Sequence, residues 1–372
     1  MINGNKNSGE ISLLLPSWHP MNKDIRRLIR QLDGKVIYLN KYGTDRKGIQ
    51  KLIEFESESE NDINLRCQRF IIPPTNIPLT NYYNCIKYFF INTPKILITT
   101  DYLLSSSLKI LCFLKNIKLY YWNDSHAKDY KKTSFIRRIV DKFLLFGFYG
   151  YLHGCEGAKY LSKITYQRSE FLPCINLEYI RDKSKKFVRN EPSEELKLIF
   201  VGHLNRRKGI DRLVNVLEII SNSSKGFTKL ITCYVIGEGD YSFSKYNFKN
   251  VNIVKFGVLN RDLLIEKMST SHYILSLSRV EPMGAAVLEG IASGCRAIVT
   301  KEVGSKYDLL EHEAGCTLSF NESKLEKNSL GILSGEFETF FKGKTNQKTE
   351  EIAKKYSLNT MKKVITNLIK EY

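Results

Sequence analysis

Two glutamates, Glu281 and Glu289, stand eight positions apart in the segment SRVEPMGAAVLEGIASG (278–294). Glu281 lies in a turn marked by Pro282, whereas Glu289 lies in an apolar stretch that predicts a helix from Gly284 onward. The first turn of such a helix offers free N–H groups and the positive end of the helix dipole, which together suit a phosphate. A carboxylate on an apolar, buried helix costs free energy unless ligand hydroxyls satisfy it.

The spacing of these residues gives the segment a chemical interpretation. At about 1.5 Å per residue, Glu289 stands roughly 7.5 Å along the helix axis from Gly284. We therefore expect a diphosphate at the helix tip, a ribose diol near Glu289, and Glu281 facing the group beyond the diphosphate. The alternative is that Glu289 pairs inside the core and that Glu281 is an exposed loop carboxylate. Two glutamates on one strand–loop–helix frame favour the ligand site.

A second loop brings positive charge. The segment FVGHLNRRKGIDRL (200–213) predicts a strand end, a loop and a helix that begins near Gly209. Arg206, Arg207 and Lys208 lie in this loop, where cations can hold a diphosphate and stabilise it as it leaves. A solvated basic loop is the alternative interpretation of the same three residues.

Length and charge set the wider frame. The chain has 372 residues, which is too long for one ordinary core and predicts two domains. The formal net charge is +18, and residues 1–190 hold 31 Lys and Arg against 17 Asp and Glu, which leaves +14 in that part. The first half is therefore expected to meet an anionic partner, such as a nucleic acid, an anionic membrane surface or a phosphorylated substrate.

Several classes of protein are disfavoured by the sequence. No two of the eight cysteines lie closer than 18 positions, so we expect buried thiols in a reducing compartment and no zinc or redox pair. The N-terminus lacks a signal-peptide pattern, and the longest apolar stretch (143–152) is too short to span a bilayer. No helix-turn-helix or RNP-like pattern supports binding of nucleic acid. We expect a cytoplasmic protein, either soluble or peripheral on a membrane.

Short apolar runs alternate with amphipathic stretches along the chain. This alternation predicts parallel sheets with helical crossovers, hence an α/β fold of two doubly wound, Rossmann-like domains facing each other across a cleft. The predicted strands are 11–17, 35–40, 95–100, 118–122, 148–154, 197–202, 230–237, 252–257, 272–278 and 295–300, and the predicted helices are 102–115, 134–147, 209–223, 260–270 and 284–293. The charged segment 181–195, which contains Pro192, is interpreted as a linker.

These motifs resemble those of the family 4 retaining glycosyltransferases of the GT-B fold (glycosyl transferases group 1). The signature of that family is a Glu-x7-Glu motif, which Glu281 and Glu289 match. The stretches EPMG, ASGCRAIVT and FVGHLNRRKGIDRL are similar to the segments around that signature. VIGEGD (235–240) and VNIVKFGVLNRDLL (251–264) match two further segments, the second of which lies near the nucleobase in the family. The resemblance is strong over 197–320 and mostly architectural before that.

The resemblance implies an enzyme that transfers a sugar from a nucleoside diphosphate sugar with retention of the anomeric configuration. Glu289 would bind the ribose, and Glu281 would hydrogen-bond the donor sugar. The backbone of Met283, Gly284 and Ala285 would approach the sugar and the phosphates.

The resemblance also places Lys208 on the diphosphate-binding lysine of the family. Lys208, with Arg206 or Arg207, would neutralise the leaving diphosphate. The family usually has an arginine where this chain has His203, so either one of the two loop arginines supplies that charge or the affinity for the donor is lower. Because the sequence contains no Asp-x-Asp motif, we expect no catalytic metal and no cofactor besides the donor substrate.

The first domain is expected to supply an acceptor-side group. His126 stands where many members of the family have an active-site histidine, although a purely structural histidine is the alternative. Asp124 is the next candidate, and His19 and His153 follow. The loop PSWHPMN (16–22) lacks the glycines that many members carry there, which leaves the acceptor side open.

The implied domains are an N-terminal acceptor-side domain (1–185), a C-terminal domain that binds the nucleotide sugar (186–355) and a C-terminal helix (356–372) that packs back toward the first domain. The basic amphipathic segment YKKTSFIRRIVDKFLLFGF (130–148) predicts contact with an anionic membrane surface, with a core-packed helix as the alternative. The expected acceptor is a glycan or a polyprenyl-diphosphate-linked glycan, and no nucleic acid.

The expected pathway is the synthesis of a bacterial surface polysaccharide, such as O-antigen, capsule or lipopolysaccharide, at the inner face of the plasma membrane. Two other interpretations stay open. One is a different GT-B sugar-nucleotide enzyme, for example an epimerase. The other is a non-catalytic basic protein that binds a membrane or a nucleic acid.

Overall fold

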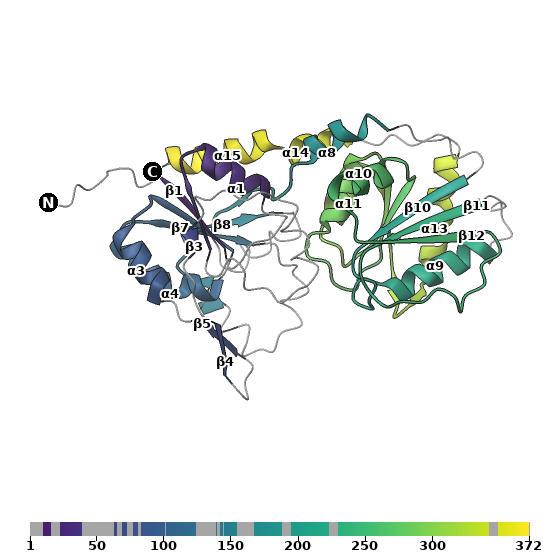
Figure 1. The fold of residues 1–372 in the computed structure, drawn as a ribbon, viewed down its shortest axis with the longest axis horizontal. Coiled ribbons are helices and arrows are strands. Elements are labelled where there is room, and N and C mark those ends of the chain that lie inside the picture. Colours follow the sequence, from purple (N-terminus) through teal and green to yellow (C-terminus); the bar gives the residue numbers. More distant parts are fainter. Residues whose placement is uncertain are drawn as a thin grey trace. The chain divides into compact units, whose positions relative to one another are not determined.

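The computed structural model of this chain describes residues 10–15, 23–38, 63–64, 69–72, 77–80, 83–100, 102–123, 139, 142–143, 145–154, 167–187, 195–222, 230–341 and 349–371. These residues form two compact units (Figure 1). Unit 1 comprises the described residues up to Ile175 together with those from Leu358 onward, and unit 2 comprises Asn176–Ser357. The boundary at Ile175 falls ten residues before the expected one at 185.

Unit 1 is built on a seven-stranded parallel sheet in the order β3-β2-β1-β6-β7-β8-β9. Its strands are β1 (Ile11–Leu15), β2 (Lys35–Tyr38), β3 (Ile63–Asn64), β6 (Ile96–Thr99), β7 (Lys118–Asn123), β8 (Gly150–His153) and β9 (Ser169–Phe171). Its described helices are α1 (Lys23–Gln31), α3 (Tyr83–Ile91), α4 (Tyr102–Leu114) and α15 (Leu358–Lys370), and β4 (Arg69–Ile72) and β5 (Ile77–Thr80) form a separate antiparallel pair. The central strands β1 and β6 are fully buried, as their dense apolar sequences predict.

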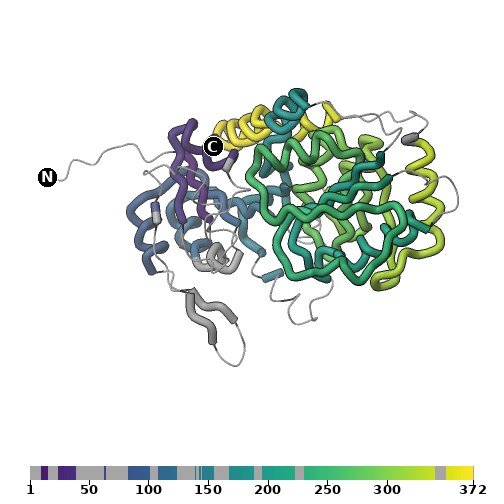
Figure 2. Tube along the Cα trace, turned by 45° about the vertical axis from the view of Figure 1, so that its right-hand side comes forward, coloured from purple at the N-terminus to yellow at the C-terminus, as the bar shows by residue number. Residues whose placement is uncertain are grey.

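The C-terminal helix belongs to unit 1. α15 packs against α1, and both views show the yellow helix beside the purple one (Figure 1, Figure 2). Just beyond α15, Glu371 accepts two hydrogen bonds of 2.8 Å from the guanidinium of Arg168, and these bonds lower the pKa of Glu371. The backbone carbonyl of Glu371 accepts a further bond of 2.7 Å from Lys118. These contacts hold the end of the chain on the sheet.

Unit 2 is built on a six-stranded parallel sheet in the order β12-β11-β10-β13-β14-β15. Its strands are β10 (Glu195–Val201), β11 (Leu230–Ile236), β12 (Val251–Gly257), β13 (Tyr273–Ser276), β14 (Arg296–Thr300) and β15 (Gly315–Leu318), with a small antiparallel pair of β16 (Phe320–Asn321) and β17 (Lys324–Leu325). Its described helices are α8 (Leu177–Ser184), α9 (Ile210–Asn222), α10 (Arg261–Ser269), α11 (Ala285–Ala292), α12 (Lys306–Glu311), α13 (Lys327–Phe341) and α14 (Thr349–Lys355).

The two sheets confirm the predicted doubly wound α/β architecture. In each sheet the first strand of the series lies between the second and the fourth, so the strand order reverses beside it. In unit 2 this reversal lies between β10 and β13, whose pairing aligns Leu198 with Tyr273. Ligands of open α/β sheets bind beyond the carboxyl ends of the strands at such a reversal. A ligand site is therefore expected at the loops that follow β10 and β13.

Two predicted elements need correction or lie partly outside the described residues. The linker prediction for 181–195 is wrong at its start, because α8 extends to Ser184 and packs against α11 and α14. The charged residues of this segment suggest a linker, but they lie on a helix of which one side is buried through Leu177 and Ile180. Of the predicted helix 134–147, residues 139, 142–143 and 145 are described as helical.

Candidate functional site

The backbones of the loops that follow β10 and β13 are in close contact. Gly209 closes the first loop with a positive φ of 79°, and a Cβ atom at this position would lie 2.0 Å from the carbonyl oxygen of Leu277. Only glycine can take this backbone conformation at such close approach. The backbone N–H of Arg279 also donates to the carbonyl of Arg207 at 2.8 Å. The loop cations and the first glutamate are therefore neighbours, although they lie about 70 residues apart in the sequence.

An ion pair lies at the centre of this arrangement. Nζ of Lys208 donates to Oε2 of Glu281, and both side chains are largely buried. The backbone N–H of Lys208 is fixed in turn by Oδ1 of Asn205 at 3.0 Å. Removing two charges from water costs free energy that the attraction between them only partly offsets, so a pair of this kind is a poor source of stability. Its position at the strand reversal favours a functional interpretation.

The amino end of α11 lies three residues beyond Glu281. Its N-cap is Gly284, in the left-handed conformation with φ 78° and ψ 46°, and Met283 before it is buried. The N–H of Val287 donates to the carbonyl of Gly284 at 2.9 Å, which leaves the N–H groups of Ala285 and Ala286 as the donors at the start of the helix. An anion at this point would meet those donors, the helix dipole and the ammonium of Lys208. The loop of Glu281 therefore links a lysine contact to the amino end of a helix, and phosphate binding there stays a prediction.

A short segment after β14 fixes the backbone around Glu281. Glu281 forms an isolated parallel bridge with Val303, its N–H donates to the carbonyl of Glu302 at 3.3 Å, and its carbonyl accepts from Gly304 at 2.9 Å. The N–H of Ser305 donates to the carbonyl of Met283 at 2.8 Å. We call residues 302–305 the clamp. A backbone bridge between distant loops leaves no local pattern in the sequence.

The clamp leaves no room for side chains at two glycines. A Cβ atom on Gly304 would lie 1.7 Å from the carbonyl oxygen of Pro282. A Cβ atom on Gly284 would lie 2.7 Å from Oγ of Ser305 and 2.7 Å from Cγ1 of Val303. The position of the Glu281 loop is therefore set by direct backbone packing rather than by a flexible connection.

Arg279 is a functional candidate that the sequence reasoning missed. Its guanidinium donates two hydrogen bonds to the carboxylate of Asp211, at 2.8 and 2.6 Å, and a third to the carbonyl of Arg206 at 2.5 Å. The bonds to Asp211 raise the pKa of Arg279. Burial acts against ionisation of Asp211, but the bonds from Arg279 outweigh it and hold the pKa of Asp211 low. Arg279 thus fastens the cationic loop to the start of α9, and its place directly after a strand end was the available signal.

The two loop arginines differ in their surroundings. Arg207 is exposed and donates to the carbonyl of Val280 at 3.2 Å, so it lies beside the glutamate loop. The side chain of Arg206 is 71% exposed and lies 3.9 Å from the carboxylate of Glu322, which is also exposed. An exposed pair at that distance contributes little. Arg207 is therefore better placed than Arg206 to support Lys208, and His203 is exposed in the same loop.

Glu289 lies within α11, five residues beyond Gly284. It is half-buried rather than enclosed, as are Ala285 and Ala286 on the same helix. The expectation that this apolar helix is buried is therefore wrong on this side, where the carboxylate of Glu289 is partly exposed.

Most acceptor-side candidates cannot be placed. His126, Asp124 and His19 lie outside the described residues. His153 is buried at the end of β8, and its Nδ1 lies 2.7 Å from Oγ of Ser169. The contacts of His153 are those of a structural side chain. Among the described residues, no three His, Cys, Asp or Glu side chains are grouped as a metal site, and metal independence stays a prediction.

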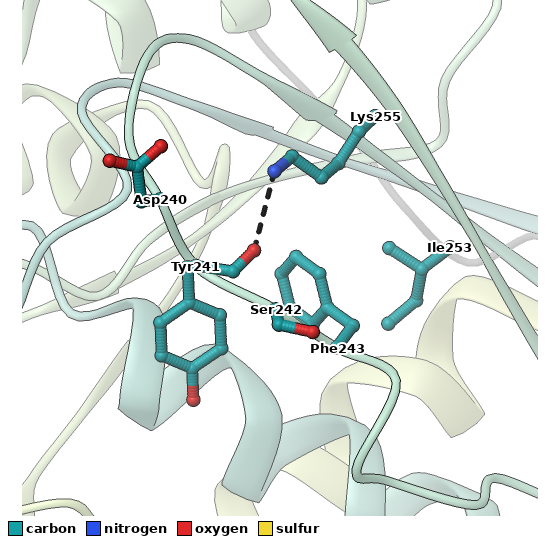
Figure 3. Close-up of a pocket in the computed structure, with 6 residues that line it drawn as sticks. All are labelled: Asp240, Tyr241, Ser242, Phe243, Ile253 and Lys255. Atoms are coloured by element: carbon teal, nitrogen blue, oxygen red, sulfur yellow. Dashed lines mark hydrogen bonds between the residues drawn. The ribbon is translucent and has the colours of Figure 1, made fainter.

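An open pocket of about 460 Å³ lies beside the edge strand β12 (Figure 3). It is lined by Asp240, Tyr241, Ser242, Phe243, Ile253 and Lys255. Nζ of Lys255 donates to the carbonyl of Tyr241 at 3.3 Å across its upper side (Figure 3). The loop that carries Asp240 and Tyr241 follows β11, and the N–H of Leu204, which precedes Lys208 in the cationic loop, donates to the carbonyl of Glu238 in it at 2.7 Å.

The ion pair, the helix N-terminus and the strand reversal all fall within one stretch of sequence. Residues 181–356 match the family model of Glycosyl transferases group 1. This group 1 segment covers nearly all of unit 2 and a little less than half of the chain. None of the curated proteins matches the sequence closely enough to count as a relative.

Solved structures resemble the whole chain. Sucrose-phosphate synthase from Thermosynechococcus elongatus has a TM-score of 0.64 at 15% identity, with 97% of this chain and 98% of that chain covered. HepE from Anabaena, solved in complex with UDP, has a TM-score of 0.66 at 12% identity, with 98% and 100% covered. The lipopolysaccharide outer core galactosyltransferase WaaB has a TM-score of 0.66 at 13% identity, with 97% and 99% covered. At these identities the likeness shows the fold alone. Because it extends over nearly the whole chain, it confirms the GT-B fold beyond the group 1 segment as well.

Proposed function

We propose that this protein is a retaining glycosyltransferase that moves a sugar from a nucleoside diphosphate sugar to a glycan or lipid-linked glycan acceptor. The observation that carries the proposal is the contact between Lys208 and Glu281 beside the amino end of α11. The match of the group 1 segment supports the reaction class. Neighbours of the same fold that were solved with UDP and UDP-glucose support a nucleotide sugar as the donor.

The roles of the residues follow from the charge that develops during transfer. The bond between the anomeric carbon and the diphosphate breaks, so negative charge grows on the departing diphosphate. Lys208 and the first N–H groups of α11 would stabilise that charge, with Arg207 beside them. Glu281 would hydrogen-bond the hydroxyls of the donor sugar and, by pairing with Lys208, hold the ammonium in place. Glu289 would accept from the ribose hydroxyls.

We propose further that the acceptor hydroxyl attacks from the side on which the diphosphate leaves, so the anomeric configuration is retained. The acceptor proton would pass to an oxygen of the leaving diphosphate. We also propose that the charges of Lys208, Arg207 and the helix end take the place of a divalent metal. Undiminished turnover in an excess of chelator would support this part of the proposal, and loss of turnover that magnesium or manganese restores would refute it.

For the pathway, we propose synthesis of a bacterial surface polysaccharide, with the acceptor carried on a polyprenyl diphosphate at the inner face of the plasma membrane. The likeness to WaaB and WaaG, whose names and descriptions refer to lipopolysaccharide synthesis, supports this choice. The acceptor-side role of His126 also remains a proposal.

The decisive experiment is a binding screen of the wild type with UDP, GDP and ADP by thermal shift and calorimetry. One nucleotide should raise the unfolding midpoint, since a ligand of the native state stabilises it by mass action. Glu289→Gln should lower the affinity for that nucleotide. Glu322→Gln, at an exposed carboxylate of the same unit, should leave the affinity unchanged.

Incubation with the corresponding nucleotide sugars would then test the reaction. Transfer gives a nucleoside diphosphate and a new glycoside whose anomeric configuration is read by NMR, whereas an epimerase gives an isomeric sugar. If no nucleotide binds, the proposed donor class is wrong. If the new glycosidic bond has the inverted anomeric configuration, the proposed stereochemistry is wrong.

A further inference from the structure

Exposed apolar side chains are concentrated in one part of unit 1. Among the described residues, twenty large hydrophobic side chains are exposed, and eleven of them lie between residues 83 and 149. The other nine are spread over unit 2 between 179 and 332, so only unit 1 has a concentration. The eleven are Tyr83, Ile86, Phe90, Ile91, Ile110, Phe113, Leu114, Ile139, Phe143, Phe146 and Tyr149.

α3 is apolar on both its inner and its outer side. Cys85 and Phe89, one helical turn apart, are buried against the core of unit 1. Phe90 and Ile91 are exposed, at 60% and 70%. A surface helix normally turns charged or polar residues outward, so an outer apolar side needs a partner.

α4 repeats this arrangement next to α3, with which it packs. Leu108 and Cys112 face the core, whereas Ile110, Phe113 and Leu114 face outward. Phe113 is 85% exposed, the highest value among these side chains. Two neighbouring helices therefore present aromatic and aliphatic groups to the outside.

Lysines connect these helices to each other and to the segment before β8. Nζ of Lys115, at the end of α4, lies 4.6 Å from the ring centre of the exposed Phe90 of α3. Nζ of Lys109 donates to the carbonyl of Phe146 and lies 4.6 Å from the ring centre of Phe148. The exposed side chains of 83–91, 108–115 and 142–149 are thus neighbours, and we call them together the apolar–basic face.

The charge of this face has one sign. Lys87, Lys115 and Lys142 are exposed on it, and its described segments, 83–91, 108–115 and 142–149, contain no Asp or Glu. Long lysine side chains can lay their apolar stems along a hydrophobic surface and extend their ammonium groups outward. Aromatic and aliphatic groups flanked by lysines match the boundary between acyl chains and anionic headgroups.

We propose that unit 1 docks through the apolar–basic face onto an anionic lipid bilayer. Docking would place Phe113 and Phe143 among the acyl chains near the headgroups, with Lys87, Lys115 and Lys142 at the phosphates. The attachment is peripheral, since no helix of the described segments is both long and apolar enough to cross a bilayer. A second copy of the chain is a poorer occupant, because face-to-face pairing would bring two sets of lysines together.

The test is flotation of the purified full chain with vesicles of phosphatidylcholine alone or of an equimolar mixture with phosphatidylglycerol. The wild type should float with the anionic vesicles and release as salt rises. Phe113→Ser with Phe143→Ser should lower the partition coefficient more than tenfold. The matched control, Leu230→Ser with Ile332→Ser, alters two exposed hydrophobic residues of unit 2 and should leave it unchanged.

A set of Lys→Gln substitutions measures the electrostatic contribution to vesicle binding. Changing Lys87, Lys115 and Lys142 to Gln should lower partitioning onto anionic vesicles by a factor on the order of one hundred and flatten its salt dependence. The control changes three exposed lysines of unit 2, Lys249, Lys324 and Lys327, to Gln, and a much smaller loss is expected. Equal binding of the wild type to neutral and anionic vesicles, or wild-type binding by both face variants, would overturn the proposal.

Two further measurements keep the outcome clear. Circular dichroism of each variant tests whether unit 1 is folded, and unchanged nucleotide affinity shows that unit 2, which holds Lys208 and Glu281, is intact. Sedimentation of the wild type over a concentration series tests the second copy as occupant. A dimer that the Phe113→Ser, Phe143→Ser variant abolishes, with vesicle binding unchanged, would also overturn the proposal. Vesicle binding does not require transfer, so this proposal and the proposed enzymatic function can fail independently.

Discussion

Unit 1 and unit 2 share one sheet plan but concentrate their unusual residues in different places. In unit 2, ionisable side chains gather where β10 and β13 end, and a largely buried ion pair joins the two loops. In unit 1, apolar side chains gather on the outer sides of α3 and α4, away from the sheet they cover. One plan thus supports recognition through strand-end loops in one unit and through helix surfaces in the other.

The contrast also appears in how each unit treats buried charge. In unit 2, Arg296 and Glu336 form a pair in which both side chains are 9% exposed, and Tyr273 completes it with a hydrogen bond to the carboxylate. That pair is fully partnered by protein groups, so it is structural. Lys208 and Glu281 are similarly shielded but lie at the strand reversal and beside a helix N-terminus. Substitutions in the Arg296–Glu336 pair should therefore act mainly on stability, whereas substitutions in the Lys208–Glu281 pair should act mainly on turnover.

The largest expected effect follows from breaking the functional pair. Lys208→Met and Glu281→Gln should each lower kcat by about 10²–10³, because each removes a group that acts on developing charge or holds one that does. Initial rates of nucleoside diphosphate release from the donor identified by the binding screen measure this. Because Lys208 and Glu281 are 19% and 15% exposed, the group left unpaired can turn toward water, so the loss in the free energy of unfolding should be smaller than for a more deeply buried pair.

The control for that prediction is the structural pair. Glu336→Gln leaves the guanidinium of Arg296 buried without its counter-charge and should destabilise unit 2 by about 3–5 kcal/mol. Any enzyme that remains folded should keep its kcat. If Glu281→Gln unfolds unit 2 as Glu336→Gln does, and folded Glu281→Gln keeps wild-type turnover, then the site is misassigned.

The next effect comes from the clamp. Gly304→Ala forces the loop of Glu281 away from residues 302–305, since its Cβ would lie 1.7 Å from a backbone oxygen. We expect a loss of about 1–3 kcal/mol in the free energy of unfolding of unit 2, from urea titration followed by circular dichroism, and a higher KM for the donor. Gly331→Ala is the control, because nothing lies within 4 Å of its added Cβ and alanine favours the helix α13.

Much of this comparison could be predicted from the sequence. Dense apolar runs located most strands of both sheets, from Ile11–Leu15 to Arg296–Thr300, and the alternation of elements gave the doubly wound plan. The edge strands β3, β9 and β15 were not predicted. The sequence did not predict the ion pair between Lys208 and Glu281, but it placed the loops of both residues at strand ends. Local sequence was sufficient there because strands and helix starts have local patterns.

What the sequence did not predict depends on distant contacts. The clamp joins residues about 20 positions apart through backbone hydrogen bonds, and the Arg279–Asp211 pair joins two loops. α3 was missed because its residues are apolar on both sides, which removes the periodicity that marks a surface helix. The same lack of periodicity that hid α3 is what makes its outer side an unusual surface.

A smaller effect should come from Arg279. Arg279→Lys keeps a positive charge but cannot make the bidentate contact with Asp211 together with the bond to the carbonyl of Arg206. The cationic loop should loosen, and calorimetry should show about fivefold weaker nucleotide binding, which corresponds to about 1 kcal/mol. Arg206→Lys, at an exposed side chain, should change the affinity less than twofold. Equal losses in both variants would show that the contacts of Arg279 with Asp211 and Arg206 are not what positions the loop.

The smallest expected effect concerns unit 1 and its dependence on pH. Burial lowers the pKa of Lys109 to about 8 from its ordinary value of 10.5. Between these two values the unfolded chain binds more protons at Lys109 than the folded chain does, so this lysine makes unit 1 more stable as pH rises through that window. Because Lys109 is only half-buried, solvent screening limits the gain to about 1 kcal/mol or less. Both tryptophans, Trp18 and Trp122, lie outside 176–357, so their fluorescence does not report on unit 2. Urea unfolding followed by that fluorescence at pH 7.5 and pH 9.5 should show a stability gain in the wild type beyond that of Lys109→Met, whereas equal gains in the two proteins would remove Lys109 as its source.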